Sequence, residues 1–436
     1  MDFLPGKLAF VVLVIVAQLL AWRYFRARLK KRLATVLLNF LYIFFNLLGF
    51  GAFLFLYALD FYPESPFLWD FVLRPALIWE MTHVLWLPVA LLLSLIKLVW
   101  SLFFRREPKG LPKLFRAAKR GPSLFNLVGL ALVLGLALAF YGYSRSLSGP
   151  ATTRLDLSFP DLPPDLEGFK IALLADFHLG LGLYPAELQK ALELAASEDP
   201  QIVLIAGDLV SRKTLSMGLF REPISALKAV PYGVYAVLGD SDHFSENPHN
   251  VTQLISGLGV RVLSDERVNI HGLPLTIIGF QDPGTPPWSL WPLAFPSDGR
   301  ELPFASLKGL NPPEDNFVVV LCHRPEGVAG AREAGADLFL AGHALGGLIA
   351  SPLSDQLNLA APFYEYSSGL YANRETLVYV TRGLSSPRLF FRLFAWPEIA
   401  VITLHKGPRS PAPTPTPTPE TPPESALEPP AAAPEP

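Results

Sequence analysis

Lys170-Ile-Ala-Leu-Leu-Ala-Asp176 is an apolar run that ends on a carboxylate, and the second half of the chain repeats this pattern. Continuous runs of this length, rich in Val, Ile and Leu, are typical of buried strands that are covered on both faces. The further runs are Gln201-Ile-Val-Leu-Ile-Ala-Gly-Asp208, Gly233-Val-Tyr-Ala-Val-Leu-Gly-Asp240, Asn316-Phe-Val-Val-Val-Leu-Cys-His323 and Ala336-Asp-Leu-Phe-Leu-Ala-Gly-His343. In open α/β sheets, ligands collect at the carboxyl ends of the strands. The five runs therefore predict a binding site at one edge of a sheet.

The residues at these strand ends are of the types that bind divalent cations. Three aspartates and two histidines end the runs, and a further histidine follows the first aspartate by two positions. Carboxylate oxygens and imidazole nitrogens together form a mixed oxygen and nitrogen site for a divalent ion. The candidate metal ligands are Asp176, His178, Asp208, Asp240, His323 and His343.

The composition indicates a chain that lies partly in lipid. Of its 436 residues, 51% are hydrophobic and 17% are charged, and the formal net charge is −2. This balance argues against a nucleic-acid-binding protein, which normally carries a concentrated basic face. Four apolar stretches, at residues 8–25, 36–59, 81–104 and 124–143, are long enough or nearly long enough for a bilayer core that needs about 20 apolar residues. We therefore expect residues 1–145 to form a four-helix transmembrane region.

The charges between these stretches predict an orientation. The loops at residues 23–32 and 105–120 are strongly basic, whereas the loop at 60–74 carries three acidic residues and one arginine. Basic loops stay in the cytoplasm. We therefore expect a protein integral to the plasma (inner) membrane whose soluble domain is extracytoplasmic. The single cysteine, Cys322, excludes an internal disulfide.

Residues 150–407 have the length of one α/β domain, in which helical patterns at 185–196, 247–257 and 325–335 lie between the apolar runs. The remaining 408–436 are rich in Pro, Thr, Ala and Glu and contain too few apolar groups to fold, so we expect a disordered tail.

The order of the candidate ligands resembles the calcineurin-like metallophosphoesterases, and most closely their membrane-anchored bacterial branch. The matching motifs are Ala175-Asp-Phe-His-Leu-Gly180, Gly207-Asp-Leu-Val210, Leu321-Cys-His-Arg-Pro325 and Ala341-Gly-His-Ala-Leu-Gly-Gly347. The resemblance implies an α/β fold, specifically a four-layer α/β/β/α sandwich with two metals at the strand ends. It also implies that Asp176 and His178 hold the first metal, that Asp208 bridges both metals, and that Asp240, His323 and His343 hold the second. Two such cations, about 3.5–4 Å apart, polarise a phosphoryl group and lower the pKa of a bridging water.

Two positions depart from the family pattern. Gly239-Asp-Ser-Asp242 stands where the family has Gly-Asn-His and an acid, so that Ser241 replaces the histidine that protonates the leaving oxygen. Leu345 replaces a second histidine that binds the first metal. His243 is our candidate for a replacement catalytic proton donor, and the alternative is an ordinary loop histidine.

The leading hypothesis is a membrane-anchored extracytoplasmic phosphoesterase that hydrolyses a phosphoester or phosphodiester. Its substrate would be a phosphorylated small molecule or lipid, including a lipid-linked or envelope compound, and its cofactors would be one or two Mn, Fe, Zn or Mg ions. The alternative is a catalytically degenerate protein of the same fold that acts in binding or scaffolding at the membrane bilayer.

Some features allow two interpretations. The segment 283–295 is rich in proline and contains Trp288 and Trp291, which predicts either an aromatic lid or foot near the bilayer, or simple packing. Asp242 is either a carboxylate behind the metal ligands or a turn former. The histidines outside the strand-end pattern, which we interpret as structural, are His83, His249, His271 and His405.

Overall fold

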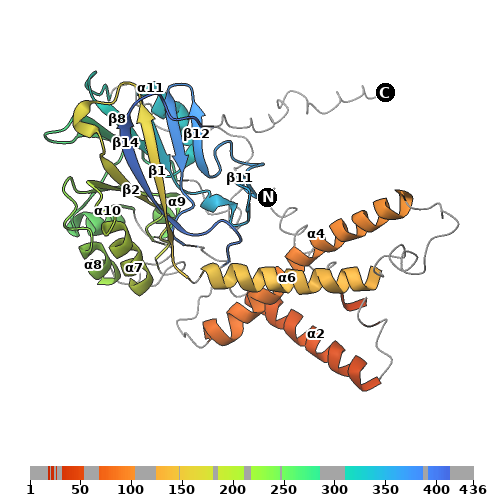
Figure 1. The fold of residues 1–436 in the computed structure, drawn as a ribbon. Coiled ribbons are helices and arrows are strands. Elements are labelled where there is room, and N and C mark those ends of the chain that lie inside the picture. The colour runs from red at the N-terminus through yellow and green to blue at the C-terminus, as the bar shows by residue number, and fades with distance from the viewer. Residues whose placement is uncertain are drawn as a thin grey trace, which may run out of the picture. The chain divides into compact units, whose positions relative to one another are not determined.

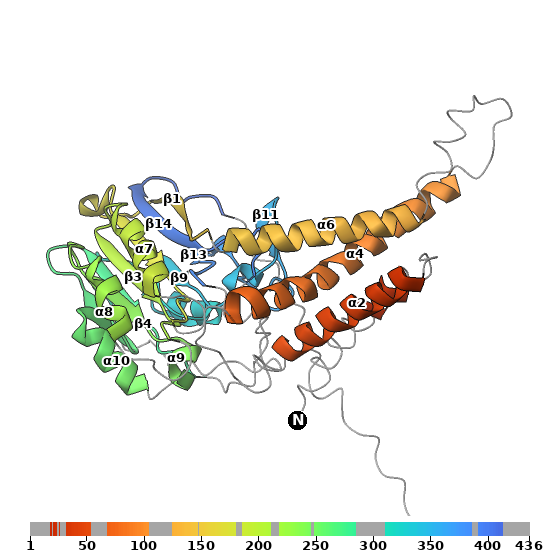
Figure 2. The same cartoon turned by 90° about the horizontal axis from the view of Figure 1, so that it is seen from below.

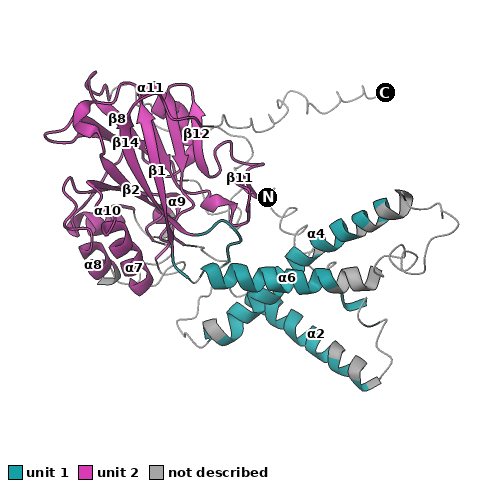
Figure 3. Cartoon of the chain, viewed as in Figure 1, with its two compact units in different colours: residues 1–149, 386–396 teal, residues 150–385, 397–436 magenta. Residues whose placement is uncertain are grey.

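The chain divides into two compact units in a computed structural model (Figure 3). The helical unit comprises Met1–Gly149 and Ser386–Trp396, and the sheet unit comprises Pro150–Ser385 and Pro397–Pro436. The structure describes residues 18–19, 21–23, 26, 32–53, 68–103, 124–146, 148–179, 185–210, 218–245, 248–284, 310–385 and 391–412. The chain therefore leaves the sheet unit after Ser385 and re-enters it at Pro397. The predicted aromatic segment from residue 285 onward, the tail from residue 413 and most of the first predicted span lie outside the described residues.

The helical unit contains long apolar helices. They are α2 (Arg32–Phe53), α4 (Arg74–Phe103), which follows the short π-helix η2 (Trp69–Leu73), and α6 (Leu124–Ser146). Among the described residues, one helical stretch, Phe71–Leu93, is long and apolar enough to cross a membrane. Shorter apolar helical stretches occur at Asn39–Gly49 and Leu130–Ser146. The division into four transmembrane spans stays a prediction.

Helix α4 begins earlier than the predicted span at residues 81–104, and it includes the acidic Glu80. The amide Nε2 of Gln18 donates a hydrogen bond to Oε2 of Glu80 at 2.7 Å. The nearby His83 is fully buried, and its Nδ1 lies 2.9 Å from the carbonyl oxygen of Trp79, four residues earlier in the same helix. These contacts agree with a structural role for His83 and explain how polar side chains are accommodated in an apolar helix.

The sheet unit contains two six-stranded mixed sheets (Figures 1 and 2). The first sheet has the order β1 (Ala151–Phe159), β14 (Glu398–Lys406), β2 (Lys170–Leu174), β3 (Ile202–Ala206), β4 (Val234–Val237) and β5 (Val260–Val262). The second has the order β12 (Gly369–Asn373), β13 (Thr376–Val380), β9 (Leu338–Ala341), β8 (Phe317–Leu321), β7 (Leu275–Gly279) and β6 (Glu266–Asn269). Strands β2 to β5 run parallel, as do β7, β8, β9 and β13. The predicted α/β class is thus confirmed.

Alternate residues along each strand enter different apolar clusters, as the two-residue period of a strand requires. Leu173 of the first sheet and Ile277 of the second belong to the same buried cluster, which lies between the sheets. On the other side of the first sheet, Ala172 shares a cluster with Leu188. Helices α7 (Pro185–Ala196), α8 (Gly218–Ser225) and α10 (Pro248–Gly257) supply this outer cluster. The outer side of the second sheet packs on α11 (Val328–Glu333), and both sheets are therefore covered on two faces.

The parallel order brings the carboxyl ends of the central strands to one edge of each sheet. Strands β2, β3 and β4 are neighbours in the first sheet, and β8 and β9 are neighbours in the second. All five carry the apolar runs that end on candidate ligands. A Cβ built at Gly207, after β3, would lie 2.7 Å from Nδ1 of His323, after β8, so the two edges meet. The fold therefore gathers the predicted site residues between the sheets.

Candidate metal centre

Four of the candidate ligands sit in a backbone conformation that side chains rarely adopt. The φ angles are 56° at Asp176, 42° at His178, 57° at Asp208 and 68° at His343. Positive φ is costly for residues other than glycine, and such strain gathers at functional sites where the surrounding structure holds it. Here the tight turns after the strands are held by backbone hydrogen bonds, such as the one from the amide of His178 to the carbonyl of Asp208 at 2.9 Å. The turns therefore place the ligand side chains close together at the strand ends.

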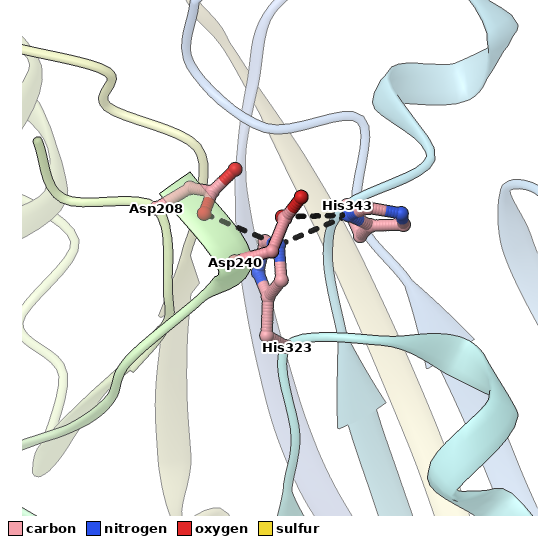
Figure 4. Close-up of side chains that lie close together, drawn as sticks. All are labelled: Asp208, Asp240, His323 and His343. Atoms are coloured by element: carbon pink, nitrogen blue, oxygen red, sulfur yellow. Dashed lines mark hydrogen bonds and ion pairs between the residues drawn. The ribbon is translucent and has the colours of Figure 1, made fainter. Parts of the chain in front are cut away.

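Figure 4 shows the side chains of Asp208, Asp240, His323 and His343 converging on one point. Nε2 of His323 lies 3.1 Å from Nδ1 of His343, 3.2 Å from Oδ1 of Asp240 and 3.4 Å from Oδ1 of Asp208. Nδ1 of His343 lies 3.3 Å from the same oxygen of Asp240. Ligand atoms about 2.0–2.1 Å from a tetrahedral ion are about 3.3–3.4 Å apart. The spacing of these four atoms therefore fits a single divalent ion among them.

A second group, Asp176, His178 and Asp208, shares Asp208 with the first. Nε2 of His178 lies 3.3 Å from Oδ2 of Asp208, whereas His323 approaches Oδ1 of the same carboxylate. Asp208 therefore turns one oxygen toward each group, which is the arrangement that a bridging ligand requires. All six predicted ligands are brought together in the two groups that the resemblance implied, and their binding of metal stays a prediction.

The two histidines of the larger group are oriented by contacts of the ring nitrogens that face away from the site. Nδ1 of His323 lies 2.7 Å from the carbonyl oxygen of Ala206. A carbonyl only accepts hydrogen bonds, so Nδ1 carries a proton and Nε2 is the nitrogen that faces the site. For His343, Nδ1 faces the site, and Nε2 lies 3.2 Å from the hydroxyl of Tyr364. Both imidazoles thus offer one nitrogen to an ion while the other is held by the protein.

Charge interactions within the site keep the carboxylates ionised. Burial alone would raise the pKa of Asp240, but Arg324 and His343 outweigh it and hold that pKa well below its ordinary value. For Asp208, burial is likewise outweighed by His323 and His178, and its pKa is lowered. Burial would lower the pKa of His323, but Asp208 and Asp240 raise it well above its ordinary value. Because metal ligands must be deprotonated, an ion that binds His323 would displace the proton that Nε2 carries in the metal-free protein.

Glycines make the space for the ligand side chains. A Cβ at Gly239 would lie 2.2 Å from Oδ1 of Asp208, and one at Gly383 would lie 2.4 Å from Oδ2 of Asp176. Real Cβ atoms essentially never come within 3.0 Å of such atoms. The backbone therefore approaches both carboxylates more closely than any other residue would permit.

We predict that Gly383→Ala lowers metal affinity by at least about tenfold, because its methyl group would displace the Asp176 carboxylate. Gly335→Ala is the matched control, since both glycines have positive φ, +65° and +73°, but a Cβ at Gly335 meets nothing within 4 Å. Elemental analysis and metal titration of the two variants measure the effect. Equal losses in both variants would show that backbone strain, and not crowding of Asp176, is responsible.

The structure gives a role to each residue in the altered third motif. The amide and the hydroxyl of Ser241 donate to Oδ1 and Oδ2 of Asp208, at 2.9 and 3.0 Å. Asp242 is fully buried and accepts hydrogen bonds from the amides of Val210 and Gly239, at 2.9 and 2.8 Å. Burial and the neighbouring Asp208 raise the pKa of Asp242 to about 7. Of the two interpretations of Asp242, the structure supports the turn former. Its carboxylate links the turn after β3 to the turn after β4 through these two hydrogen bonds.

The second position that departs from the family pattern is Leu345, in the turn η5 (Leu345–Gly347). It is 8% exposed and offers no ligand atom. His243 lies in the short helix α9 (Asp240–Ser245), and its ring is next to Gly284. Among the described residues, neither metal-ligand group includes His243, His83, His249, His271 or His405. The role of His243 as proton donor stays a prediction.

Three residues beside the larger group were not recognised in the sequence. Nε of Arg324 donates to Oδ2 of Asp282 at 2.8 Å, and its Nη2 lies 3.2 Å from Oδ2 of Asp240. Its Nη1 lies 3.2 Å from Nε2 of His343, which also faces Tyr364. Arg324 directly follows the candidate ligand His323, so the sequence could predict that it lies near the site but not which residues it contacts. The partners come from loops distant in sequence and could not be inferred.

Comparison with known proteins agrees with this geometry. Residues 169–346 match the family described as calcineurin-like phosphoesterase. A transmembrane protein with metallophosphoesterase domain from Danio rerio is 26% identical over 283 residues, covering 64% of this chain and 63% of that protein. The metallophosphoesterase YkuE of Bacillus subtilis is 26% identical over 280 residues, covering 61% of this chain and 89% of that protein. The phosphodiesterase YaeI of Escherichia coli is 28% identical over 243 residues, covering 54% of this chain and 82% of that protein.

The extent of these matches differs among the relatives. The chain spans slightly less than two thirds of the length of the Danio rerio protein and of a similarly described protein from Bos taurus, at 63% and 62%. The matched family region contains all six candidate ligands, from Asp176 to His343.

Proposed function

Because this chain carries a calcineurin-like metallophosphoesterase domain, we propose that it is a metal-dependent phosphoric ester hydrolase that acts on a phosphoester or phosphodiester. The observation that carries the proposal is the shared carboxylate of Asp208, which turns one oxygen to each of two ligand groups. The phosphodiesterase name of the Escherichia coli relative supports the same reaction class. One or two divalent ions, of Mn, Fe, Zn or Mg, are the proposed cofactors.

The ligand sets suit this chemistry. Asp176, His178 and Asp208 would hold one ion, and Asp208, Asp240, His323 and His343 the other. When bound, the ions would polarise the phosphoryl group and activate water. Ser241 would position Asp208, because both of its polar groups donate to that carboxylate.

Protonation of the leaving oxygen is the step for which the site is least equipped. Ser241 cannot act as an acid near neutral pH, so we assign the step to His243. The Nε2 atom of His243 is buried and has no hydrogen-bond partner among the described residues. A general acid typically contributes about 10²–10⁴-fold to a reaction, and esters with good leaving groups, which depend least on it, should be the better substrates.

We also propose that the enzyme is anchored in the plasma (inner) membrane with its catalytic domain extracytoplasmic, where a lipid-linked or envelope phosphate ester would be its substrate. The apolar helix Phe71–Leu93 and the transmembrane description of the Danio rerio relative support anchoring. The basic loops at residues 23–32 and 105–120 support the orientation.

Metal analysis combined with an activity assay tests the proposal. Purified full-length protein, loaded separately with Mn, Zn or Mg, should contain one to two ions per chain and hydrolyse a soluble aryl phosphodiester. Removal of the ions with a chelator should abolish hydrolysis, and adding back the metal should restore it.

The alternative is a protein of the same fold that binds or scaffolds without catalysis. The observation that favours it is Leu345, a buried apolar residue at the position of an expected ligand. A single ion or none per chain, with no hydrolysis under any of the three metals, would support this alternative and overturn the enzyme proposal.

A further inference from the structure

In the described part of the sheet unit, the large apolar side chains that are exposed are gathered in one short segment. Among the described residues of this unit, the large hydrophobic side chains that are exposed are Leu353, Leu357, Leu359 and Phe363, at 90%, 62%, 44% and 37%. Single exposed hydrophobic residues are normal, whereas contiguous groups mark surfaces that bind something. We call residues 350–363 the exposed hairpin.

The exposed hairpin is a preformed structure with one outward face. Strands β10 (Ala350–Ser351) and β11 (Ser354–Asn358) form a two-stranded sheet that includes no other strand of the described residues. Because strand side chains alternate, Asp355 and Leu357 lie on the same, exposed side of β11, and Leu353 and Leu359, which directly precede and follow this strand, are exposed as well. The carboxylate of Asp355 forms an ion pair with Nη1 of Arg382 at 3.0 Å, and Arg382 also pairs with Glu398.

The inner side of the hairpin is fixed to the sheet unit. The side chain of Asn358 accepts hydrogen bonds from the amides of Ala360 and Ala361, at 2.8 and 3.0 Å. Its own amide donates to the hydroxyl of Ser367 at 2.8 Å. Gln356 donates from Nε2 to the carbonyl oxygen of Leu370 at 3.0 Å. The apolar face is therefore presented outward by a polar scaffold beneath it.

Both ends of the exposed hairpin lead directly to the metal centre. The candidate ligand His343 and the turn η5 precede it in the chain. Tyr364 follows Phe363 and places its hydroxyl 3.2 Å from Nε2 of His343. An apolar surface and the phosphate-binding chemistry are thus built from one continuous stretch of the chain.

We propose that the exposed hairpin inserts its leucines and Phe363 into the surface of a lipid bilayer, and that the metal centre takes amphipathic phosphate esters from that surface. The inference rests on the phosphoesterase function and membrane anchoring proposed above. A bilayer is the fitting occupant because the segment exposes four large apolar side chains, which suit the boundary between headgroups and acyl chains. An apolar helix in the same chain would keep the domain at a high effective concentration beside the membrane.

Depth-dependent quenching in lipid nanodiscs tests insertion with the full-length protein. Leu353→Cys is labelled with an environment-sensitive fluorophore, and the native Cys322 does not compete because it is fully buried. Glu375→Cys, in the turn between β12 and β13 with its side chain 91% exposed, is the matched control. The label at residue 353 should shift to shorter wavelength and be quenched several-fold more than the control by lipids that carry a doxyl group on the acyl chain.

The other occupants predict different results, and each would overturn the proposal. If the helical unit of the same chain covers the hairpin, the emission shifts without quenching by doxyl lipids. If a second copy covers it, the shift depends on protein concentration. If nothing covers it, residues 353 and 375 behave alike.

A kinetic comparison separates this inference from the proposed function. The double variant Leu353→Ser with Leu357→Ser should hydrolyse a phosphodiester lipid in vesicles about tenfold more slowly, because two inserted apolar side chains are lost. Its rate with a soluble aryl phosphodiester should be unchanged. If the double variant hydrolysed both substrates as fast as the unaltered protein does, insertion would be refuted and the enzyme proposal would stand. If the unaltered protein hydrolyses neither substrate, the enzyme proposal fails, and the quenching experiment still decides the insertion.

Discussion

Asp208→Asn should lose metal at both ligand groups and hydrolyse phosphodiesters at least about 100-fold more slowly, because an amide offers only one oxygen in place of two. The carboxylate turns Oδ2 toward His178 and Oδ1 toward His323, so one substitution affects both groups. Elemental analysis of the purified variant and its hydrolysis rate measure the loss.

The substitution should also destabilise the metal-free protein. His323 and His178 hold the pKa of Asp208 below its ordinary value, so the ionised carboxylate stabilises the folded state, and an amide loses this charge interaction. We therefore expect the metal-free variant to unfold at a lower temperature than the metal-free parent. Added metal should raise the unfolding temperature of the parent but not of the variant, because only the parent binds it.

The control for this experiment is Asp156→Asn, a strand residue whose side chain is 79% exposed and lies outside both groups. It should keep the metal content, the rate and the metal-induced stabilisation of the parent. Retention of two ions per chain by Asp208→Asn would show that Asp208 does not bridge the groups.

Asp240→Asn should weaken metal binding at the larger group by about ten- to 100-fold, even though asparagine is the residue that the family carries at this position. In this chain, the guanidinium of Arg324 lies 3.2 Å from Oδ2 of Asp240 and is held in place by Asp282. The aspartate therefore offsets a fixed positive charge beside the ion. An uncharged amide would leave that positive charge to repel a divalent cation.

A second substitution tests whether charge is the cause. Adding Arg324→Gln to Asp240→Asn should recover most of the lost affinity, since it removes the uncompensated charge. Adding Arg324→Lys should not, because lysine keeps the charge. Metal titration of the three variants against a competing chelator gives the affinities. Equal recovery by glutamine and lysine would mean that Arg324 acts through packing and not through charge.

The strand ends were the predictable part of the site. Apolar runs of strand length place their last residues at a sheet edge whenever the strands are parallel, and five of the six candidate ligands were located in this way, with His178 two residues after the first. The helix predicted at 185–196 has the same bounds in the structure, and the helix predicted at 247–257 begins one residue later. These elements depend on local pattern, which the sequence displays.

The parts that were not predicted depend on contacts between distant segments. Tyr364 reaches His343 only because the exposed hairpin folds back on the turn that follows β9. Gln18 accommodates Glu80 inside a helix whose apolar pattern predicted a later start. The region predicted as one helix at 325–335 contains the short 3-10 turn η4 (Pro325–Gly327) before α11. In each case a tertiary partner, or a proline-led turn, decided the outcome over local periodicity.

The excursion of Ser386–Trp396 into the helical unit affects how the protein can be dissected. The backbone passes between the two units at three places, near residues 149, 385 and 396. A protease that nicks the chain at any one of them leaves at least one polypeptide that still contributes residues to both units. Release of an intact sheet unit would take three cuts, and the freed product would consist of two polypeptides held together by the pairing of β14 with β1 and β2.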